Sequence, residues 1–351
     1  MIGVHCDEKR RHKHLTGDLG IENAKATELM ERDHNEVSGH GQHTSKTFHL
    51  SDFFLHDDGN MDKVDNDTHR ILRLIFGYSY VTPTFDEFAM FMAFSSALRS
   101  ADLSRQVGAV IARGDSIVST GANDVPRAGG GLYWPARNAE TGEVVDQEDG
   151  RDYVRGYDQN SNQTAQLIQE ILNEFPKDAQ EIAQGVLEKS GIKHITEYGR
   201  VVHAEMEAIL ACGRSNISTI DATLYTTTFP CHNCAKHIVA SGISRVVYVE
   251  PYAKSKAIEF HSDSITNVKS GDGDEKRVLL EPFVGVGPRS FFDLFSINNG
   301  AGYPIQRKDT NGEIVKWEQK EAKLRLQMLP ASYLEREALA ARLLDGYLES
   351  P

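Results

Sequence analysis

The chain has 351 residues, is 40% apolar and 25% charged, and carries a formal net charge of −13. An acidic chain of this kind is a poor candidate for binding long nucleic acids, which need a basic surface. It has no run of about 18 uninterrupted apolar residues, so we expect no membrane span. The start of the chain is charged and rich in histidine rather than apolar, so we expect no secretory signal and a cytoplasmic location.

The N-terminal 60 residues are polar and rich in His, Asp and Glu. We predict a helix over residues 21–30 and a short buried strand or helix over residues 47–55. No glycine-rich phosphate loop followed by Lys and Ser/Thr occurs, so the chain does not carry a P-loop kinase of its own. For the histidine-rich start we expect an arm without regular structure, and the alternative is a second metal site. Its candidate ligands are His5, Cys6, His12 and His14.

Helical spacing of apolar residues predicts a helix over residues 86–103, followed by a β-hairpin that turns at Gly114-Asp115. Residues from about 127 to 200 interrupt this pattern with a glycine-rich loop and two amphipathic helices, so we interpret them as an insertion. The core resumes as alternating helices and strands, in which Gly242 is a plausible helix C-cap. The predicted strands are 107–112, 116–120, 223–227, 245–250 and 277–283. The predicted helices are 165–175, 179–189, 203–212, 231–241, 255–260, one after Pro288, and an amphipathic helix over 330–348.

Four cysteines, Cys6, Cys212, Cys231 and Cys234, are too few for a disulfide framework. The C-x-x-C pair at 231 and 234 indicates metal or redox chemistry in a reducing compartment. We interpret Cys212, at the end of its predicted helix, as a core cysteine.

The strongest signal combines His203-Ala204-Glu205 with Pro230-Cys231-His232-Asn233-Cys234. One imidazole and two thiolates suit zinc, and three protein ligands leave the fourth tetrahedral position for water. Bound zinc lowers the pKa of that water towards about 7. Glu205 lies close enough to move protons without being a ligand. H-x-E followed by P-C-x-x-C is the known signature of zinc nucleobase deaminases. A structural zinc site is the alternative, but no fourth ligand is apparent, and we expect neither His232 nor His237 to serve.

Three segments, SRQVGAVIARGDSIVSTGANDVP, the HAE helix and LYTTTFPCHNCAKHIVASGISRVVYVEPY, resemble the deoxycytidylate deaminase family. The resemblance covers residues 85–126 and 200–252. It implies one zinc ion per chain and an α/β fold: a cytidine-deaminase-like three-layer α/β/α sandwich with a mixed central sheet, here with a helical insertion and a C-terminal extension. It also implies that Asn123 contacts the sugar and base, unless Asn123 is only a turn residue. The base pocket would be lined by Ala204, Thr226, Thr228 and Phe229, and the alternative for Phe229 is a packed aromatic.

The segments VEPYAKSKAIEFHSDSI and EPFVGVGPRSFFDLF resemble a bacterial family of anti-phage deaminases that act on dCTP and dCMP. In that family the deaminase follows a P-loop kinase-like domain. Residues 1–60 would then be the tail of such a domain or an N-terminal arm, 61–300 the deaminase domain, and 301–351 an extension. Cations in these segments and before the first strand could bind phosphates, or could simply be solvated. They are Arg105, Lys254, Lys256, His261 and Arg289.

We therefore expect hydrolytic deamination of dCTP or dCMP to the uracil nucleotide and ammonia, which would deplete the deoxycytidine nucleotide pool of phage-infected cells. A polynucleotide or tRNA deaminase, and a catalytically silent regulatory or RNA-binding subunit, are the alternatives. The resemblance also implies a homo-oligomer, and an inhibitory RNA or nucleotide effector is left open. The inserted residues 151–163 suggest a lid, an effector site or an ordinary exposed loop.

Overall fold

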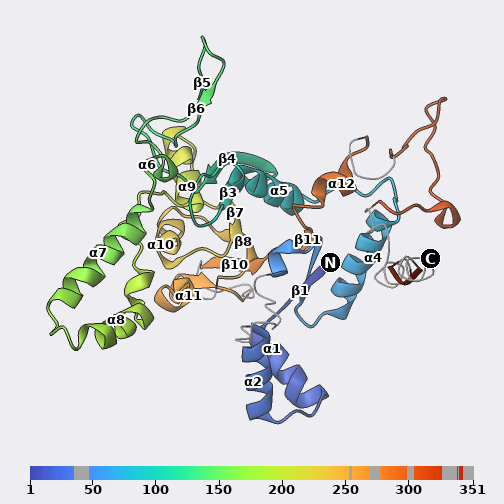
Figure 1. Ribbon diagram of the computed structural model, residues 1–351. Coiled ribbons are helices and arrows are strands. Elements are labelled where there is room, and N and C mark those ends of the chain that lie inside the picture. Colours follow the sequence, from blue (N-terminus) through green and yellow to red (C-terminus); the bar gives the residue numbers. More distant parts are fainter. Residues whose placement is uncertain are drawn as a thin grey trace, which may run out of the picture. The chain divides into compact units, whose positions relative to one another are not determined.

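The structure is a computed structural model (Figure 1) that describes residues 1–34, 47–252, 255–268, 277–298, 304–325, 338 and 340–342. The chain forms two compact units, Phe88–Phe283 and a second made of Met1–Glu87 with Val284–Pro351. The predicted limits 1–60, 61–300 and 301–351 stay a prediction. Most of the helix predicted over 330–348 lies outside the described residues. Within the described ranges, no helix is both long and apolar enough to cross a membrane.

A six-stranded sheet in the order β4-β3-β7-β8-β10-β9 forms the centre of the Phe88–Phe283 unit. Strand β3 is antiparallel to β4 and β7, whereas β7, β8, β10 and β9 run parallel to one another. The sheet is therefore mixed, as predicted. Its strands are β3 (Gly108–Arg113), β4 (Ser116–Ala122), β7 (Thr223–Thr228), β8 (Arg245–Glu250), β9 (Ile265–Thr266) and β10 (Val278–Pro282).

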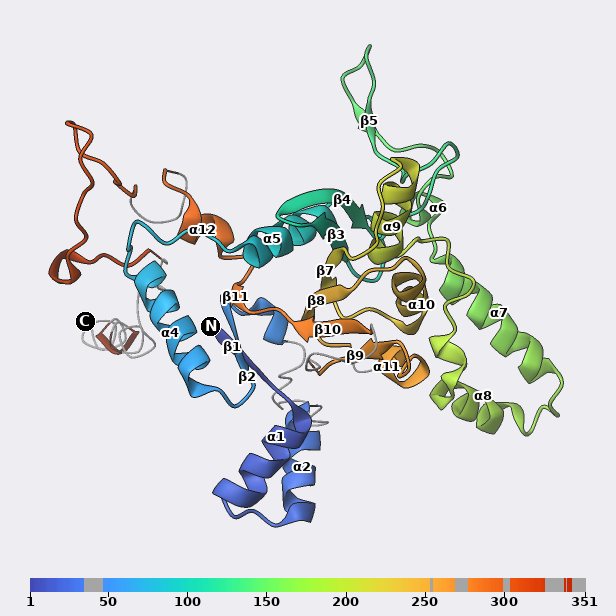
Figure 2. The same cartoon turned by 180° about the vertical axis from the view of Figure 1, so that it is seen from behind.

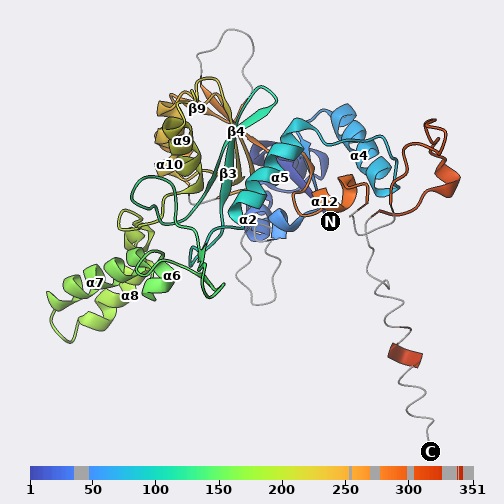
Figure 3. The same ribbon diagram turned by 90° about the horizontal axis from the view of Figure 1, so that it is seen from above.

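Helices α5 (Phe85–Ala97) and α9 (Ala204–Arg214) pack on opposite faces of this sheet. A Cβ on Gly108 would meet the backbone of α5, and a Cβ on Gly121 would meet the backbone of α9. Gly108 pairs with Ala122, and Gly121 with Ala109, so the two glycines face opposite sides. Figure 3 shows α9 and α10 (His232–Ala240) on one side of β3 and β4, and α5 on the other. This arrangement confirms the predicted α/β fold with a mixed sheet between helices.

The core on the α9 side is built from side chains of five strands and three helices, including Leu224, Ile238, Val246 and Leu280, all at most 2% exposed. Burial of each such side chain stabilises the fold by roughly 1.5–3 kcal/mol. At the end of α10, Gly242 has φ +75°, which confirms the predicted glycine cap. The short helix α11 (Ala257–Phe260) packs against α10.

The insertion leaves the sheet after β4 and returns immediately before α9. It contains a small hairpin and a pair of helices that lie side by side (Figures 1 and 2). The two helices confirm the prediction, although the first begins six residues earlier than its apolar spacing indicates. The elements are β5 (Ala136–Arg137), β6 (Val144–Val145), α6 (Asp152–Arg155), α7 (Gln159–Asn173), α8 (Gln180–Lys189) and a 3-10 turn at Gly191–His194.

The second unit contains a three-stranded sheet in the order β1-β2-β11, in which β1 and β2 are parallel. The expected unstructured arm is therefore wrong, because the first residues form a paired strand and two helices. Side chains from β2, α4, β11 and α12 make its core: Phe53, Leu55, Ile71, Leu74, Val286 and Leu294. The elements are β1 (Ile2–Cys6), α1 (Glu8–Lys13), a π turn at His14–Asp18, α2 (Asn23–His34), a 3-10 turn at Phe48–Leu50, β2 (Phe53–Asp57), α4 (Met61–Ile75), β11 (Gly285–Val286), α12 (Phe291–Phe295) and a 3-10 turn at Gln319–Glu321.

Candidate active site

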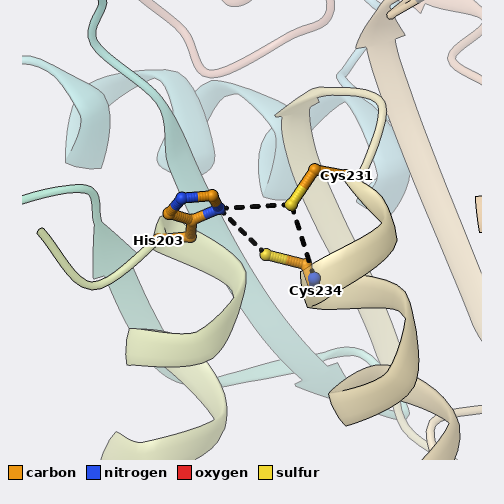
Figure 4. A group of neighbouring side chains, drawn as sticks. All are labelled: His203, Cys231 and Cys234. Carbon is orange, nitrogen blue, oxygen red and sulfur yellow. Dashed lines mark hydrogen bonds between the residues drawn. The ribbon is translucent and has the colours of Figure 1, made fainter. Parts of the chain in front are cut away.

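Two helix starts bring the predicted metal ligands together. His203 immediately precedes α9, and Cys231 is the N-cap of α10, where its Sγ accepts a hydrogen bond from the Cys234 amide at 3.4 Å. Nδ1 of His203 lies 3.3 Å from the Sγ atoms of both Cys231 and Cys234 (Figure 4). The sequence separates these residues by up to 31 positions, and the packing of α9 and α10 on the same face of the sheet closes that separation.

The three donor atoms fit a zinc ion. One ring nitrogen and two sulfurs lie within 4.8 Å of one another, which is a soft nitrogen–sulfur set typical of zinc. Across the described ranges this is the only cluster of three or more potential ligands, so the alternative of a second site among His5, Cys6, His12 and His14 is not supported. Three protein ligands are the arrangement of a catalytic zinc site, whereas structural sites usually have four.

Hydrogen bonds polarise the metal-free ligands. The Cys234 thiol and His203 together lower the pKa of Cys231 to about 4. The resulting thiolate raises the pKa of His203 to about 9. A hydrogen bond with Cys231 and the burial of Cys234 raise the pKa of the Cys234 thiol. One thiolate is therefore already formed near neutral pH, and a positively charged imidazole lies beside it.

Glu205 occupies the first turn of α9 and is 4% exposed. Its Oε2 accepts a hydrogen bond from the Cys234 thiol at 3.5 Å, so its carboxyl group lies beside the ligand cluster. Burial raises the pKa of this carboxyl group. A carboxyl group that gains and loses a proton closer to neutral pH is suited to general acid–base work.

This geometry agrees with the comparisons between the chain and known proteins. The family model described as "Cytidine and deoxycytidylate deaminase zinc-binding region" matches residues 83–250. Those residues are therefore similar to the zinc-binding region of cytidine and deoxycytidylate deaminases.

The chain is also similar to individual proteins. The deoxycytidylate deaminase of Enterobacteria phage T2 is 49% identical over 55 residues, which are 16% of this chain and 29% of that protein. The deoxycytidylate deaminase of Saccharomyces cerevisiae is 28% identical over 170 residues, 48% of this chain and 39% of that protein. The chain thus spans well under half the length of either relative. A dCMP deaminase from cyanophage S-TIM5, crystallised with dCMP and dUMP, is 18% identical with a TM-score of 0.33, over 58% of this chain and all of that one.

Asn123 immediately follows β4 and is 6% exposed. Its Oδ1 accepts from the Val107 amide at 2.7 Å, and its Nδ2 donates to the Arg105 carbonyl at 2.9 Å. It does not have the left-handed backbone of the alternative turn residue. An amide side chain has two donor hydrogens and two acceptor lone pairs, so one of each remains for a substrate.

The other predicted pocket residues lie on β7, just after it or at the start of α9. Ala204 and Thr226 are fully buried, and the Thr226 hydroxyl donates to the Thr228 carbonyl at 3.1 Å. The Thr228 hydroxyl donates to Glu250 at 3.3 Å. Phe229 packs edge-to-face on Tyr248 with ring centroids 4.8 Å apart, which matches the packed-aromatic alternative. Contact between these residues and a substrate stays a prediction.

The predicted phosphate-binding cations belong to different parts of the chain. Arg105 is exposed, and its guanidinium lies over the Tyr252 ring at 5.5 Å from the centroid. Lys256 is exposed and lies 3.7 Å from Glu259, while His261 is half-buried after α11. Arg289 is exposed in the other unit, and Lys254 lies outside the described residues. Arg105 is the member of this set that Asn123 contacts, because the Asn123 Nδ2 donates to the Arg105 carbonyl.

Several contacts near the site were not predicted from the sequence. Tyr252 packs against Arg105, although its place in the VEPY segment gave no sign of that role. The Ser255 hydroxyl donates to the Pro230 carbonyl at 2.7 Å and so ties the loop before Cys231 to the chain after β8. Asp124 forms a buried ion pair with Arg151 from the insertion. No spacing rule links these residues, because each pair meets only through the tertiary fold.

Proposed function

We propose that the chain is a zinc-dependent hydrolytic deaminase of deoxycytidine nucleotides, which converts dCMP, dCTP or both into dUMP or dUTP and ammonia. The observation that carries the proposal is the convergence of His203, Cys231 and Cys234 with the buried carboxyl group of Glu205 beside them. A purely structural module would have no use for a buried acid at a three-ligand metal site.

The residues divide the chemistry between them. His203, Cys231 and Cys234 would hold zinc, which when bound supplies a Lewis acid that lowers the pKa of water. Glu205 takes a proton from the attacking water and delivers protons to the ring nitrogen and to the departing amino group. The C4–N bond breaks, a C4–O bond forms, and one water is consumed for each ammonia released. The raised pKa of Glu205 favours this exchange near neutral pH.

Substrate recognition is proposed on the same framework. Asn123 would use its free donor and acceptor on the sugar and base, and the chain around Ala204 and Thr226–Phe229 would line the base pocket. Arg105 would contact a phosphate, because an exposed guanidinium offers several donors in a planar fork. The relatives named deoxycytidylate deaminases support dCMP. The extension motifs around Lys254–His261 and Arg289 support acceptance of dCTP.

The test is a deamination assay of the zinc-loaded chain on dCMP, dCTP, cytidine and a short oligonucleotide, followed by absorbance and ammonia release. We expect turnover of dCMP or dCTP, with cytidine slower because it lacks a phosphate. Activity only on the oligonucleotide would favour a polynucleotide deaminase. No turnover of any substrate by fully zinc-loaded protein would favour a silent regulatory subunit.

In a bacterial host, such an activity would lower the deoxycytidine nucleotide pool during phage infection. The support is the resemblance of VEPYAKSKAIEFHSDSI and EPFVGVGPRSFFDLF to anti-phage deaminases. A cytoplasmic location and a homo-oligomeric state are part of this proposal. The check is a phage challenge of cells that express the wild-type chain or Glu205→Gln, with nucleotide pools measured. Equal protection by both proteins would contradict a defence role for the deamination.

A further inference from the structure

The two ends of the insertion meet beside the active site. An antiparallel bridge joins Asp124 to Val202: the Asp124 amide donates to the Val202 carbonyl at 3.3 Å, and the Val202 amide donates back at 3.0 Å. Asn123 precedes Asp124, and His203 follows Val202. In an antiparallel pair these two neighbours lie on the same side of the bridge. The bridge therefore joins the segment that carries a predicted substrate contact to the segment that carries a metal ligand.

One side of the bridge is fixed by a buried arginine. Nη2 of Arg151 lies 3.2 Å from the Asp124 carboxylate and donates to the Tyr133 carbonyl at 2.6 Å. Nη1 of Arg151 lies 3.2 Å from the Asp146 carboxylate. These three charged side chains are only 6%, 2% and 8% exposed, for Arg151, Asp124 and Asp146 in turn. Breaking these buried contacts would be costly, because it would leave a buried charge unpaired.

The other side of the bridge is fixed by Arg200, two residues before Val202. Its Nη1 lies 2.7 Å from the Asp152 carboxylate, and its Nη2 donates to the Gly150 carbonyl at 2.9 Å. Segment 150–152 thus contacts both ends of the insertion. Its Arg151 contacts Asp124, where the chain leaves the sheet, and its Gly150 and Asp152 contact Arg200, where the chain returns. We call the residues Asp124, Gly150–Asp152, Arg200 and Val202 the neck.

We propose that Arg151 and Arg200 are positioning residues of the active site: through the neck they hold Asn123 next to His203, and so set the substrate contact relative to the metal. Neither arginine contacts the ligand cluster, so their effect passes through the bridge. The role of Asn123 in this inference rests on the proposed function, whereas the placement of His203 does not. Arginine suits the task because its planar fork can bond two groups at a fixed angle.

The experiment compares Arg151→Met, Arg151→Lys and Arg200→Gln with the control Arg155→Met. Arg155 is a nearby exposed arginine, and its side chain donates to the Asp149 carbonyl at 2.9 Å. For each variant the thermal midpoint, zinc retention against a chelator, and kcat and KM for dCMP are measured.

We expect Arg151→Met to bind zinc about 10-fold less tightly, as is found when groups that orient a ligating histidine are removed. We also expect its kcat/KM for dCMP to fall. Arg151→Lys should recover part of both, and Arg155→Met should match the wild type. In the Arg151→Met background, adding Asn123→Ala should cost much less than it does alone, because Asn123 would already be displaced.

A lower thermal midpoint with wild-type zinc retention and kcat/KM would overturn the proposal, as would full additivity with Asn123→Ala. If Arg151→Met does not fold, the same measurements on Arg151→Lys and Arg200→Gln decide. If the wild-type chain deaminates nothing, the proposed function has failed, and zinc retention alone still tests the placement of His203.

Discussion

A Cβ atom on Gly121 would lie 2.1 Å from the carbonyl oxygen of Ala204, so helix α9 packs on strand β4 with no side chain between them. The same Cβ would lie 2.6 Å from the Ala208 amide nitrogen. This close approach puts the first turn of α9, with Glu205 and the preceding His203, directly against the sheet.

Gly121→Ala should therefore destabilise the fold and disturb the metal site together. Both contacts are backbone atoms that cannot rotate away, so we expect a loss of about 3 kcal/mol in the free energy of unfolding. Urea denaturation measures it, and chelator competition measures zinc affinity. Gly213→Ala is the control, because Gly213 lies near the end of the same helix with nothing within 4 Å of its Cβ position. Equal stability of the two variants would contradict the packing argument.

Glu205→Gln should keep zinc and lose activity. The amide preserves the size of the buried side chain but cannot carry a proton, so we expect kcat to fall by about 10²–10⁴-fold. Glu207→Gln is the matched control, since Glu207 is also buried on α9 but pairs with Arg214 instead of the ligand cluster. Metal analysis and dCMP turnover of both variants make the comparison. Normal turnover by Glu205→Gln would remove it from the mechanism.

Cys231→Ser and Cys234→Ser should each lose most of the bound zinc and with it the activity, because a serine hydroxyl is a poor zinc ligand compared with a thiolate. Cys212→Ser should keep its zinc, since Cys212 is buried in the core at 0% exposure and is outside the ligand cluster. Metal content after dialysis measures the outcome. Full occupancy in either of the first two variants would contradict the ligand assignment.

Zinc affinity should rise with pH. Without metal near neutral pH, His203 carries a proton because the Cys231 thiolate raises its pKa to about 9. The pKa of Cys234 is also raised, whereas that of Cys231 is lowered to about 4, so Cys231 has already lost its proton. Binding then displaces protons from His203 and Cys234. The logarithm of the apparent affinity should rise by about two per pH unit from about pH 5 to 8. Chelator competition across this range tests the slope, and a flat profile would contradict it.

Arg70→Met should destabilise the unit that contains α4 and β11. Both nitrogens of the Arg70 fork bond the fully buried Glu87 carboxylate at 2.7 Å, and the amides of Thr84 and Val286 bond it as well. Removing the arginine leaves a buried charge without its counter-ion, which costs about 3–5 kcal/mol. Lys63→Met, at the exposed pair with Asp58, should cost under about 1 kcal/mol. Thermal unfolding of both variants gives the comparison.

Apolar periodicity and turn residues in the sequence located most elements of the Phe88–Phe283 unit. The strand over 245–250 was predicted at the residues where it occurs, and the hairpin around Gly114 and the cap at Gly242 were also found. These features are local, because turn residues and alternation act over a few positions. Strand β1 was missed, since its pairing with β2 joins residues about 50 positions apart and it is only five residues long.

The sequence by itself determined the donor groups of the candidate zinc site, because one histidine, two cysteines and a glutamate stand in two short motifs. Only the tertiary structure decided how that site is held. The close contact of Gly121 with α9, the packing of Arg105 on Tyr252, and the pairing of Arg151 with Asp124 all join segments distant in the chain. Which side chains can bind a metal depends on residue type, and residue type is read directly from a sequence. Position and electrostatic environment depend on which distant segments fold against one another, and short spacings do not encode that.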